Sequence, residues 1–411
     1  MKYLFIHQNF PGQYLHILKH LAARGRDQII FISEPNANHL AGVRKVVYRL
    51  ERGANRATHR DAREFELASL RAETVARTAM QVKRLGFTPD IIIGHHGWGE
   101  LLNIRDVWPE TPLLGYFEFF YHTAGVDVGF DPEFPADPSL FPRIRAKNAV
   151  NLLALTLGGH GQTPTRWQRA TFPAWAAAGI EILPEGVDLT LCKPLAAERG
   201  RPLVLGEISI SPGEKLVTYV ARNLEPYRGF HVMMRALARV LAARPDVRAV
   251  LVGGDEVSYG MRPPAGSTWR ARMLAELGGK IDPGRVHFPG RIAYRHFLAL
   301  LRRSDAHVYL TYPFVASWSL REALALGAPV IGSDTEPVRE FVRDRHNGLL
   351  TPCLDPARLA GRILELLEDR ELARRLGTAA RRYAEQHLRL RDHIAAYKNV
   401  VRRLTREAIF Q

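Results

Sequence analysis

Two arginines in the second half of the chain are the residues best suited to bind an anion. Arg222 and Arg228 lie in the run 221–230, between an expected strand at 216–221 and an expected helix at 230–243. A guanidinium group binds phosphate oxygens through paired hydrogen bonds, and a helix N-terminus adds free N–H groups and partial positive charge. The pattern predicts a diphosphate clamp, with two solvated surface arginines as the alternative.

The segment Thr311–Asp334 is the clearest stretch of the sequence. A strand end, a loop, a one-sided helix ended by Gly327 and a buried strand follow one another. We expect Glu322 on the first turn of this helix, facing Ser317–Ser319, where a carboxylate can accept two hydrogen bonds from a ribose diol. A glutamate near a helix N-terminus is also explained by the helix dipole alone.

Glycine-bearing turns follow three other expected strands, and a missing side chain there lets a ligand approach the backbone closely. The candidate ligand-binding residues in these turns are Gly12, Gly253, Asp255, Arg291 and Ile292. None of the turns contains the GxGxxG dinucleotide fingerprint. We expect the backbone of the run 288–293 to border a nucleobase.

Polar and aromatic side chains follow two neighbouring strands of the first half. They predict a surface for a sugar-like acceptor that contains His95, His96, Trp98, Glu118 and Tyr121. No metal site is predicted, because adjacent side chains of an extended segment point to opposite sides and cannot easily share one ion. A buried histidine of the core explains at least one of His95 and His96 equally well.

Short apolar runs alternate with helical patterns in both halves, which is typical of βαβ units and a parallel sheet covered on both faces. In the first half, strands are expected at 3–6, 28–33, 45–50, 90–94 and 112–117, and helices at 13–23 and 59–85. In the second half, strands are expected at 216–221, 249–252, 286–288, 307–310 and 328–332, and helices at 230–243, 356–367, 370–387 and 392–403.

The alternation stops after residues 180–188, and a polar stretch with Pro and Gly continues to Lys215. This interruption predicts a first domain over 1–184, a second over 185–387 and a helical tail over 388–411. Ligands of such open sheets bind outside the carboxyl ends of the strands. The candidate residues above all follow strands, so we expect them at those edges.

Composition excludes several classes of protein. The chain has 411 residues, 46% apolar and 24% charged, which excludes general disorder and predicts two or three domains. Its two cysteines exclude a disulfide framework, and its apolar runs are far shorter than the roughly 18–20 residues of a spanning helix. The N-terminus becomes polar too early for a signal peptide, so a cytoplasmic protein is expected. The net charge of +15 favours anionic partners.

Four segments occur together in an order and spacing that resemble the family 4 glycosyltransferases. They are Phe314–Asp334, the turn Arg222–Gly229, Pro184–Asp188 and Asn347–Leu350. Phe10–Gly12, Glu118–Tyr121 and Glu225–Gly229 resemble a bacterial subgroup of that family. The resemblance covers nearly the whole chain. It implies the α/β GT-B fold, with two Rossmann-like domains facing across a cleft and a C-terminal helix crossing back.

The resemblance also implies an activity. It is the retaining transfer of a sugar from a nucleotide diphosphate sugar to a glycan, lipid-linked or small-molecule acceptor, without a metal or cofactor. By position, Arg222 and Arg228 would hold the diphosphate and Glu322 the ribose, while Glu118, His95 or His96 would replace a family histidine. The remaining donor-side residues would be Gly12, Gly253, Asp255, Arg291, Ile292, Val315, Ala316, Ser317, Trp318 and Ser319.

Three departures from the family pattern leave the sugar open. Phe314 occupies the position of a glutamate that commonly contacts the transferred sugar, Val315–Ser317 replace the usual glycine-rich loop, and Arg228 replaces the usual lysine. The alternatives are a nucleotide-sugar epimerase, a catalytically silent nucleotide-sugar binder and, from charge alone, a nucleic-acid binder, for which no recognition module is found. Basic helices around Arg343, Arg345 and 374–382 would suit an anionic membrane on the cytoplasmic face, or are simply solvated faces.

Overall fold

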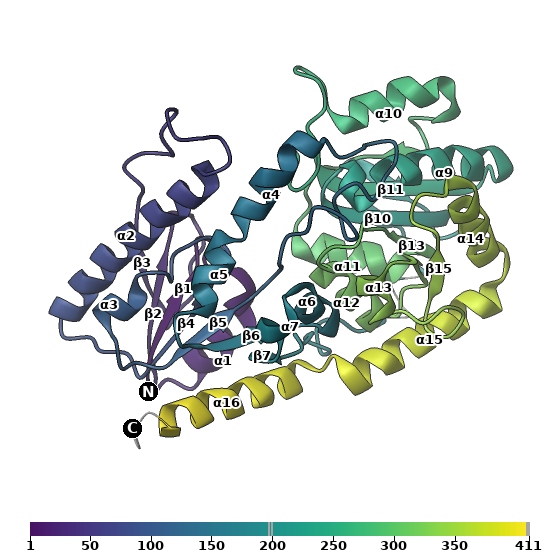
Figure 1. Cartoon of the computed structure of the whole chain (residues 1–411). Coiled ribbons are helices and arrows are strands. Elements are labelled where there is room, and N and C mark those ends of the chain that lie inside the picture. The colour runs from purple at the N-terminus through teal and green to yellow at the C-terminus, as the bar shows by residue number, and fades with distance from the viewer. Residues whose placement is uncertain (196–197, 199, 408–411) are drawn as a thin grey trace. The chain divides into compact units, whose positions relative to one another are not determined.

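The computed structural model describes residues 1–195, 198 and 200–407, which form two compact units (Figure 1). Unit 1 contains Met1–Gly125, Ala136–Gly186 and the chain from Leu390 onward, and unit 2 contains Val126–Pro135 and Val187–Arg389. The chain therefore passes from unit 1 into the main part of unit 2 after Gly186, two residues later than the expected boundary at 184. Residues 126–135, expected in the first domain, belong to unit 2 instead. Residues 408–411 of the expected tail lie outside the described part of the chain.

Unit 1 is built on a seven-stranded parallel sheet of order β3-β2-β1-β4-β5-β6-β7. The strands are β1 Lys2–Ile6, β2 Gln28–Ser33, β3 Arg44–Val47, β4 Ile91–His95, β5 Leu113–Tyr116, β6 His160–Thr163 and β7 Ile180–Ile182. Side chains of β1 alternate between two cores: Tyr3 and Phe5 pack on one face, and Leu4 and Ile6 on the other. This two-sided burial explains the uninterrupted apolar runs of the sequence.

Helices cover both faces of this sheet. They are η1 Gly12–Tyr14, α1 Leu15–Ala23, α2 Arg63–Arg84, α3 Ile104–Val107, η2 Pro138–Leu140, α4 Phe141–Lys147, α5 Ala149–Leu155, α6 Arg166–Thr171, α7 Ala174–Ala177 and α16 Leu390–Glu407. The last of these, drawn yellow in Figure 1, belongs to unit 1 and packs against α1. Its Tyr397, Val400 and Val401 join the core that contains Phe5.

Unit 2 has a six-stranded parallel sheet of order β12-β11-β10-β13-β14-β15. The strands are β10 Lys215–Asn223, β11 Val247–Gly254, β12 Val286–His287, β13 Ala306–Tyr309, β14 Val330–Ser333 and β15 Leu349–Thr351. The helices are η3 Pro226–Arg228, α9 Phe230–Ala243, α10 Trp269–Leu277, η4 Gly278–Lys280, α11 Tyr294–Arg303, α12 Trp318–Ala325, α13 Glu336–Arg339, α14 Pro356–Glu368 and α15 Arg370–His387.

Most expected strands and helices are present, with ends shifted by a few residues, and α9 and α15 have the expected bounds. The polar stretch before Lys215 was expected to lack strands and contains an antiparallel hairpin, β8 Leu203–Leu205 and β9 Ile208–Ile210. Leu203, Leu205 and Ile210 of this hairpin are buried against Val250 and Leu300. Strand β6 and helices α4–α7 were not predicted, because their runs are too short for periodicity to identify.

Polar contacts, buried at Asp131 and exposed at Glu133, hold the segment 126–135 in unit 2. Asp131 accepts a hydrogen bond of 2.5 Å from Tyr312 and lies 2.9 Å from His231 Nε2. Glu133 forms a two-pronged ion pair with Arg235, with N–O distances of 2.6 and 2.8 Å. Asp131, Glu133 and His231 have the spacing of metal ligands, and in the structure they contact Tyr312, Arg235 and each other. These contacts join residues about 100 to 181 positions apart, which no local pattern in the sequence reveals.

Among the residues that the structure describes, no helix is both long enough and apolar enough to cross a bilayer.

Candidate functional site

Strands β10 and β11 of unit 2 end in register, because Asn223 lies opposite Gly254. β13 runs parallel to β10 on its other side and ends at Tyr309. The turns that follow these three strands therefore lie at one edge of the sheet, where helix N-termini also gather. Most of the predicted donor-side residues are in these turns.

Arg228 lies at the end of η3 and points into the loop that follows β13. Its Nη1 donates hydrogen bonds to Thr311 Oγ1 at 2.8 Å and to the Val315 carbonyl at 3.1 Å. Burial lowers the pKa of Arg228, but the hydroxyls of Tyr309 and Tyr259 raise it overall, so the group stays cationic. The structure therefore gives this arginine a second role, which is to hold the loop before α12.

The next residue in the chain, Gly229, requires the absence of a side chain. It has a φ of +69°, and a Cβ there would lie 2.5 Å from Leu310 Cβ. The left-handed turn sends the chain directly from η3 into α9.

Arg222 has a different environment. Its side chain is exposed, and within the described part of the chain it makes no hydrogen bond or ion pair. The neighbouring Asn223 is 4% exposed and accepts a hydrogen bond of 3.0 Å from Arg291, which also pairs with Glu256 at 2.8 Å. A free guanidinium thus lies beside a fixed polar cluster at the strand ends.

Glu322 lies in the second turn of α12, one turn later than expected. Its Oε1 accepts a hydrogen bond of 2.5 Å from the hydroxyl of Tyr294, the first residue of α11. Burial raises the pKa of Glu322, and the Tyr294 hydroxyl opposes this rise. Arg291 and Ile292 immediately precede α11. Two separate hydrogen-bonded pairs, Arg291 with Asn223 and Tyr294 with Glu322, therefore lie within three residues of each other along the chain at the start of α11.

The loop Val315–Ser319 was expected to offer backbone N–H groups to a ligand, and the structure corrects this in part. The N–H of Ser317 already donates to Tyr309 Oη at 2.8 Å. The Ser317 and Ser319 hydroxyls are 2.9 Å apart at the start of α12 and bond to each other. The Ser317 hydroxyl also donates to Tyr309 Oη at 3.1 Å, so both its N–H and its hydroxyl are already used within unit 2.

Phe314 belongs to an aromatic cluster beside Arg228. Its ring centroid lies 5.2 Å from that of Tyr227 and 5.0 Å from that of Tyr259. The guanidinium carbon of Arg228 lies 5.1 Å from the Tyr259 centroid and 5.8 Å from that of Phe314, within the range of cation–π attraction. The departure from the family glutamate thus places an apolar ring next to the clamp.

Glu225 also lies at this edge, although the sequence suggests no role for it beyond its place in the family-like segment Glu225–Gly229. It is fully buried, and its carboxylate accepts hydrogen bonds from the N–H groups of Ser258, Tyr259 and Gly260 at 3.1, 3.2 and 3.0 Å. It therefore fixes the loop that follows β11. The sequence feature that could have pointed to Glu225 is its position directly before Pro226, where a helix begins.

Gly253 and Asp255 have structural roles in this loop. A Cβ on Gly253 would lie 2.9 Å from Leu224 Cδ2, so this glycine packs against its own unit. Asp255 pairs with Arg270 at 2.5 Å. Gly254 is the tighter position, because a Cβ there would lie 2.6 Å from Asn223 Oδ1.

Unit 1 has its own polar edge at the ends of β1, β4 and β5. His95 Nε2 lies 3.6 Å from Glu118 Oε2, and the His95 ring stacks on Tyr116 at 5.2 Å and on Trp98 at 6.3 Å. His7 meets His95 edge to face at 5.2 Å. The Gly12 turn lies against this group, because a Cβ there would be 3.0 Å from His7 Nδ1.

Two residues expected at this edge lie elsewhere in unit 1. His95 and His96 are both buried, at 2% and 3% exposed, but His96 packs on Phe117 with ring centroids 4.5 Å apart, whereas His95 faces Glu118. Tyr121 donates its N–H to Asn148 at 2.8 Å, and Lys147 lies 3.9 Å above its ring. The opposite orientations expected for His95 and His96 are confirmed.

Replacing His96 with leucine should make the free energy of unfolding less dependent on pH below about 6.5. Burial lowers the pKa of His96 to about 3, and the unfolded chain titrates near 6.5. Between these values only the unfolded state takes up the proton, so stability is lost as the pH falls. When the pH falls from 6.5 to 5, the free energy of unfolding of wild type should therefore drop by about 2 kcal/mol more than that of the His96→Leu variant. Chemical denaturation at both pH values measures this, and parallel profiles would contradict it.

Two family models match the chain. The model for the glycosyl transferase family 4 group matches residues 25–192, and the model for glycosyl transferases group 1 matches residues 206–383. Together they span both units and include the Arg222–Arg228 turn and Glu322. The chain belongs to glycosyltransferase family 4. Its two Rossmann-like units are those of the GT-B fold.

Curated relatives include enzymes that act on inositol compounds. A D-inositol 3-phosphate glycosyltransferase from Nocardia farcinica is 31% identical over 203 residues, which cover 49% of this chain and 42% of that protein. A phosphatidyl-myo-inositol mannosyltransferase from Mycobacterium leprae is 30% identical over 244 residues, or 56% of this chain and 57% of that protein. This family 4 chain thus spans about half the length of the curated relatives it matches.

Solved structures support the fold over the whole length. Sucrose-phosphate synthase from Thermosynechococcus elongatus matches with a TM-score of 0.71 at 17% identity, covering 98% of this chain and 99% of that one. Anabaena Alr3699/HepE in complex with UDP-glucose matches with a TM-score of 0.69 at 18% identity, over the same shares.

Proposed function

We propose that this chain is a retaining glycosyltransferase that moves a sugar from a nucleoside diphosphate sugar to a carbohydrate, lipid-linked or small-molecule acceptor. The observation that carries the proposal is the set of charged residues that follow the strand ends at one edge of the sheet of unit 2. There, Arg222 is free, Arg228 is buried and cationic, and Glu322 is held by Tyr294. Family membership agrees with it.

The proposed chemistry follows from charge. Cleavage of the anomeric bond leaves negative charge on the diphosphate, and preorganised donors aimed at that charge supply the largest catalytic effect. Arg222 and Arg228 would bind the diphosphate, and Glu322 would accept hydrogen bonds from the ribose. Arg291 and Ile292 would border the base. Retention by attack on the same face requires no protein nucleophile, and the proposed reaction uses no metal.

The polar edge of unit 1 would receive the acceptor. His95 Nε2 lies 3.6 Å from Glu118 Oε2, which is within ion-pair range but outside hydrogen-bond distance, and Trp98 stacks on His95. We propose that this pair orients or deprotonates the acceptor hydroxyl. The curated relatives make inositol phosphate an acceptor to include in the test.

The test is a donor and acceptor panel. Thermal unfolding is followed with UDP, GDP, dTDP and ADP and with their sugars, since a ligand at 100 times its Kd stabilises the protein by about 2.7 kcal/mol. The stabilising donor is then incubated with inositol phosphate and simple sugars, with and without EDTA, and products are analysed. Anomeric retention and transfer in EDTA are expected. An inverted product or an absolute metal requirement would contradict the mechanism.

The same panel separates the alternatives. An epimerase would convert the donor sugar without an acceptor, whereas the models and relatives above are all named as glycosyltransferases. A silent binder, favoured by Phe314, would be stabilised by the nucleotide without transfer or hydrolysis. Peripheral contact with an anionic membrane would appear as sedimentation with acidic vesicles.

A further inference from the structure

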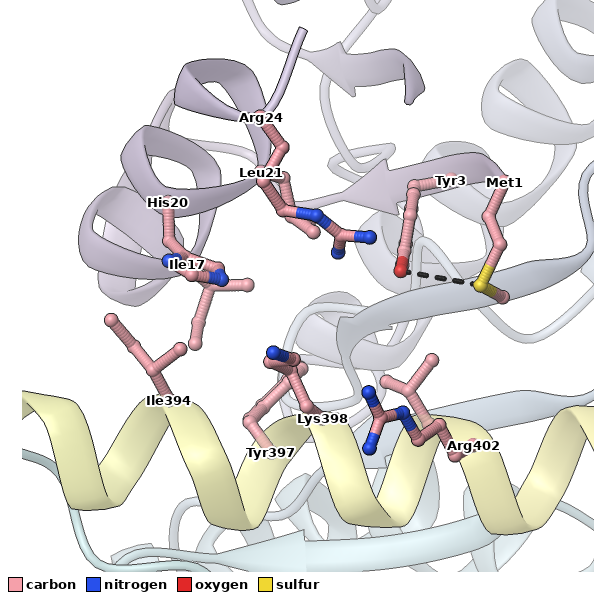
Figure 2. A pocket seen from close by; sticks show the side chains of 11 residues that line it. Met1, Tyr3, Ile17, His20, Leu21, Arg24, Ile394, Tyr397, Lys398 and Arg402 are labelled. Carbon is pink, nitrogen blue, oxygen red and sulfur yellow. Dashed lines mark hydrogen bonds between the residues drawn. The ribbon is translucent and has the colours of Figure 1, made fainter. Parts of the chain in front are cut away.

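A cavity in unit 1 lies at the opposite end of β1 from His7. It is lined by Met1 and Tyr3 at the start of β1 and by side chains of α1 and α16 (Figure 2), and its volume is about 60 Å³. His7 and the proposed acceptor edge follow the other end of the same strand. The cavity is therefore separate from the proposed transferase site.

Hydrogen-bond donors outnumber acceptors around this cavity. The Tyr3 hydroxyl donates to Met1 Sδ at 3.4 Å, and a thioether is a weak acceptor. His20 Nε2 is buried and has no hydrogen-bond partner in the described part of the chain. With the described residues, the side chains of Lys398 and Arg402 form no ion pair. Figure 2 shows these groups around one space.

The charges do not balance locally. Arg24 is paired with Asp27 at 3.4 Å, and the Asp27 side chain is only 1% exposed. Lys398 and Arg24, together with burial, lower the pKa of His20, which reflects how close these cations lie to it. Lys398 is half-buried and Arg402 is exposed, and neither pairs with a carboxylate of the described residues. A phosphomonoester carries about −1.5 to −2 at neutral pH and has three acceptor oxygens.

The remaining lining is apolar. Ile17 and Leu21 of α1 face Ile394 and Val401 of α16. Such a surface binds hydrocarbon rather than a free hydrated ion. The ligand should therefore carry an apolar group next to its charged end.

We propose that this cavity binds a phosphomonoester that carries an apolar group, with the phosphate between Arg24 of α1 and Lys398 and Arg402 of α16. Helix α16 follows directly after α15 of unit 2 in the chain. A ligand bound to both α1 and α16 would fasten this returning helix onto unit 1. The site does not depend on the proposed transferase function.

The probe is n-hexyl phosphate, titrated calorimetrically into the full chain without nucleotide sugar. We expect saturable binding, about ten-fold tighter than inorganic phosphate, because burial of a few CH₂ groups adds affinity. Arg402→Gln and Lys398→Gln should each weaken binding about ten-fold, since each loses one charge-assisted hydrogen bond. Arg406→Gln is the matched control, because Arg406 lies exposed on α16 outside the cavity. It should bind as wild type does.

Further arms identify the source of the phosphate and exclude the donor site. Competition by phosphatidylcholine vesicles with phosphatidic acid would assign a lipid headgroup, and no competition would assign a soluble ester. Both results keep the proposal. Hexyl phosphate that does not bind, that is displaced by UDP, or that binds Lys398→Gln and Arg402→Gln as tightly as wild type would overturn it. Because no transfer is measured, a failure of the proposed transferase activity leaves this result independent.

Discussion

Replacing Arg222 with alanine is expected to reduce turnover about 10²-fold, because one donor to the developing charge on the diphosphate is lost. Arg222 is exposed and, among the described residues, has no partner, so the unfolding temperature should not change. Steady-state kinetics with the donor identified above measure the effect. Arg222→Lys should restore part of the rate, since it restores charge without the planar fork.

Two comparisons sharpen this test. Arg239→Ala removes an exposed arginine of α9 that lies outside the site, and its turnover should equal that of wild type. Arg228→Ala should lose both rate and thermal stability, because Arg228 also holds Thr311 and the Val315 carbonyl. The sequence alone assigned both arginines to the diphosphate clamp and gave neither of them a structural role. Near-normal turnover of Arg222→Ala would remove this residue from the clamp.

Replacing Glu225 with alanine is expected to lower the stability of unit 2 by about 2–4 kcal/mol, because three hydrogen bonds to a buried carboxylate are lost. The loop 258–260 would lose its anchor, and Tyr259 beside Arg228 would move with it. Turnover should therefore also fall, by about ten-fold. Differential scanning calorimetry resolves the transition of the unit, and kinetics follow the second effect.

Glu256→Ala is the matched control for stability. Glu256 follows the same strand, but its side chain is 64% exposed and its ion pair with Arg291 is solvated. Such pairs contribute about 0–1 kcal/mol, so this variant should unfold close to the wild-type temperature. Equal losses from both variants would show that burial of Glu225 is not the cause.

The sequence by itself determined the class of the fold and the positions of most of its elements. Uninterrupted apolar runs such as Ile91–Ile93 identify strands buried on both faces, because successive side chains pack alternately into the cores on the two sides of the sheet. The bounds of α9 were also predicted from the sequence, because its apolar run begins after Gly229 and ends before Arg244. Since ligands bind at the carboxyl ends of parallel strands, the turns at Arg222 and Glu322 could be singled out.

Tertiary structure decided the roles of individual side chains at these positions. Local pattern cannot distinguish the exposed Arg222 from the buried Arg228, because the difference is made by segments distant in the chain. It also cannot show that His95 faces Glu118 while the equally buried His96 packs on Phe117. The same holds for Glu322, whose partner Tyr294 belongs to another helix. Residues 126–135 belong to unit 2 through contacts to Tyr312, His231 and Arg235. Periodicity records which face of an element is buried, whereas packing between distant segments determines what each buried group touches.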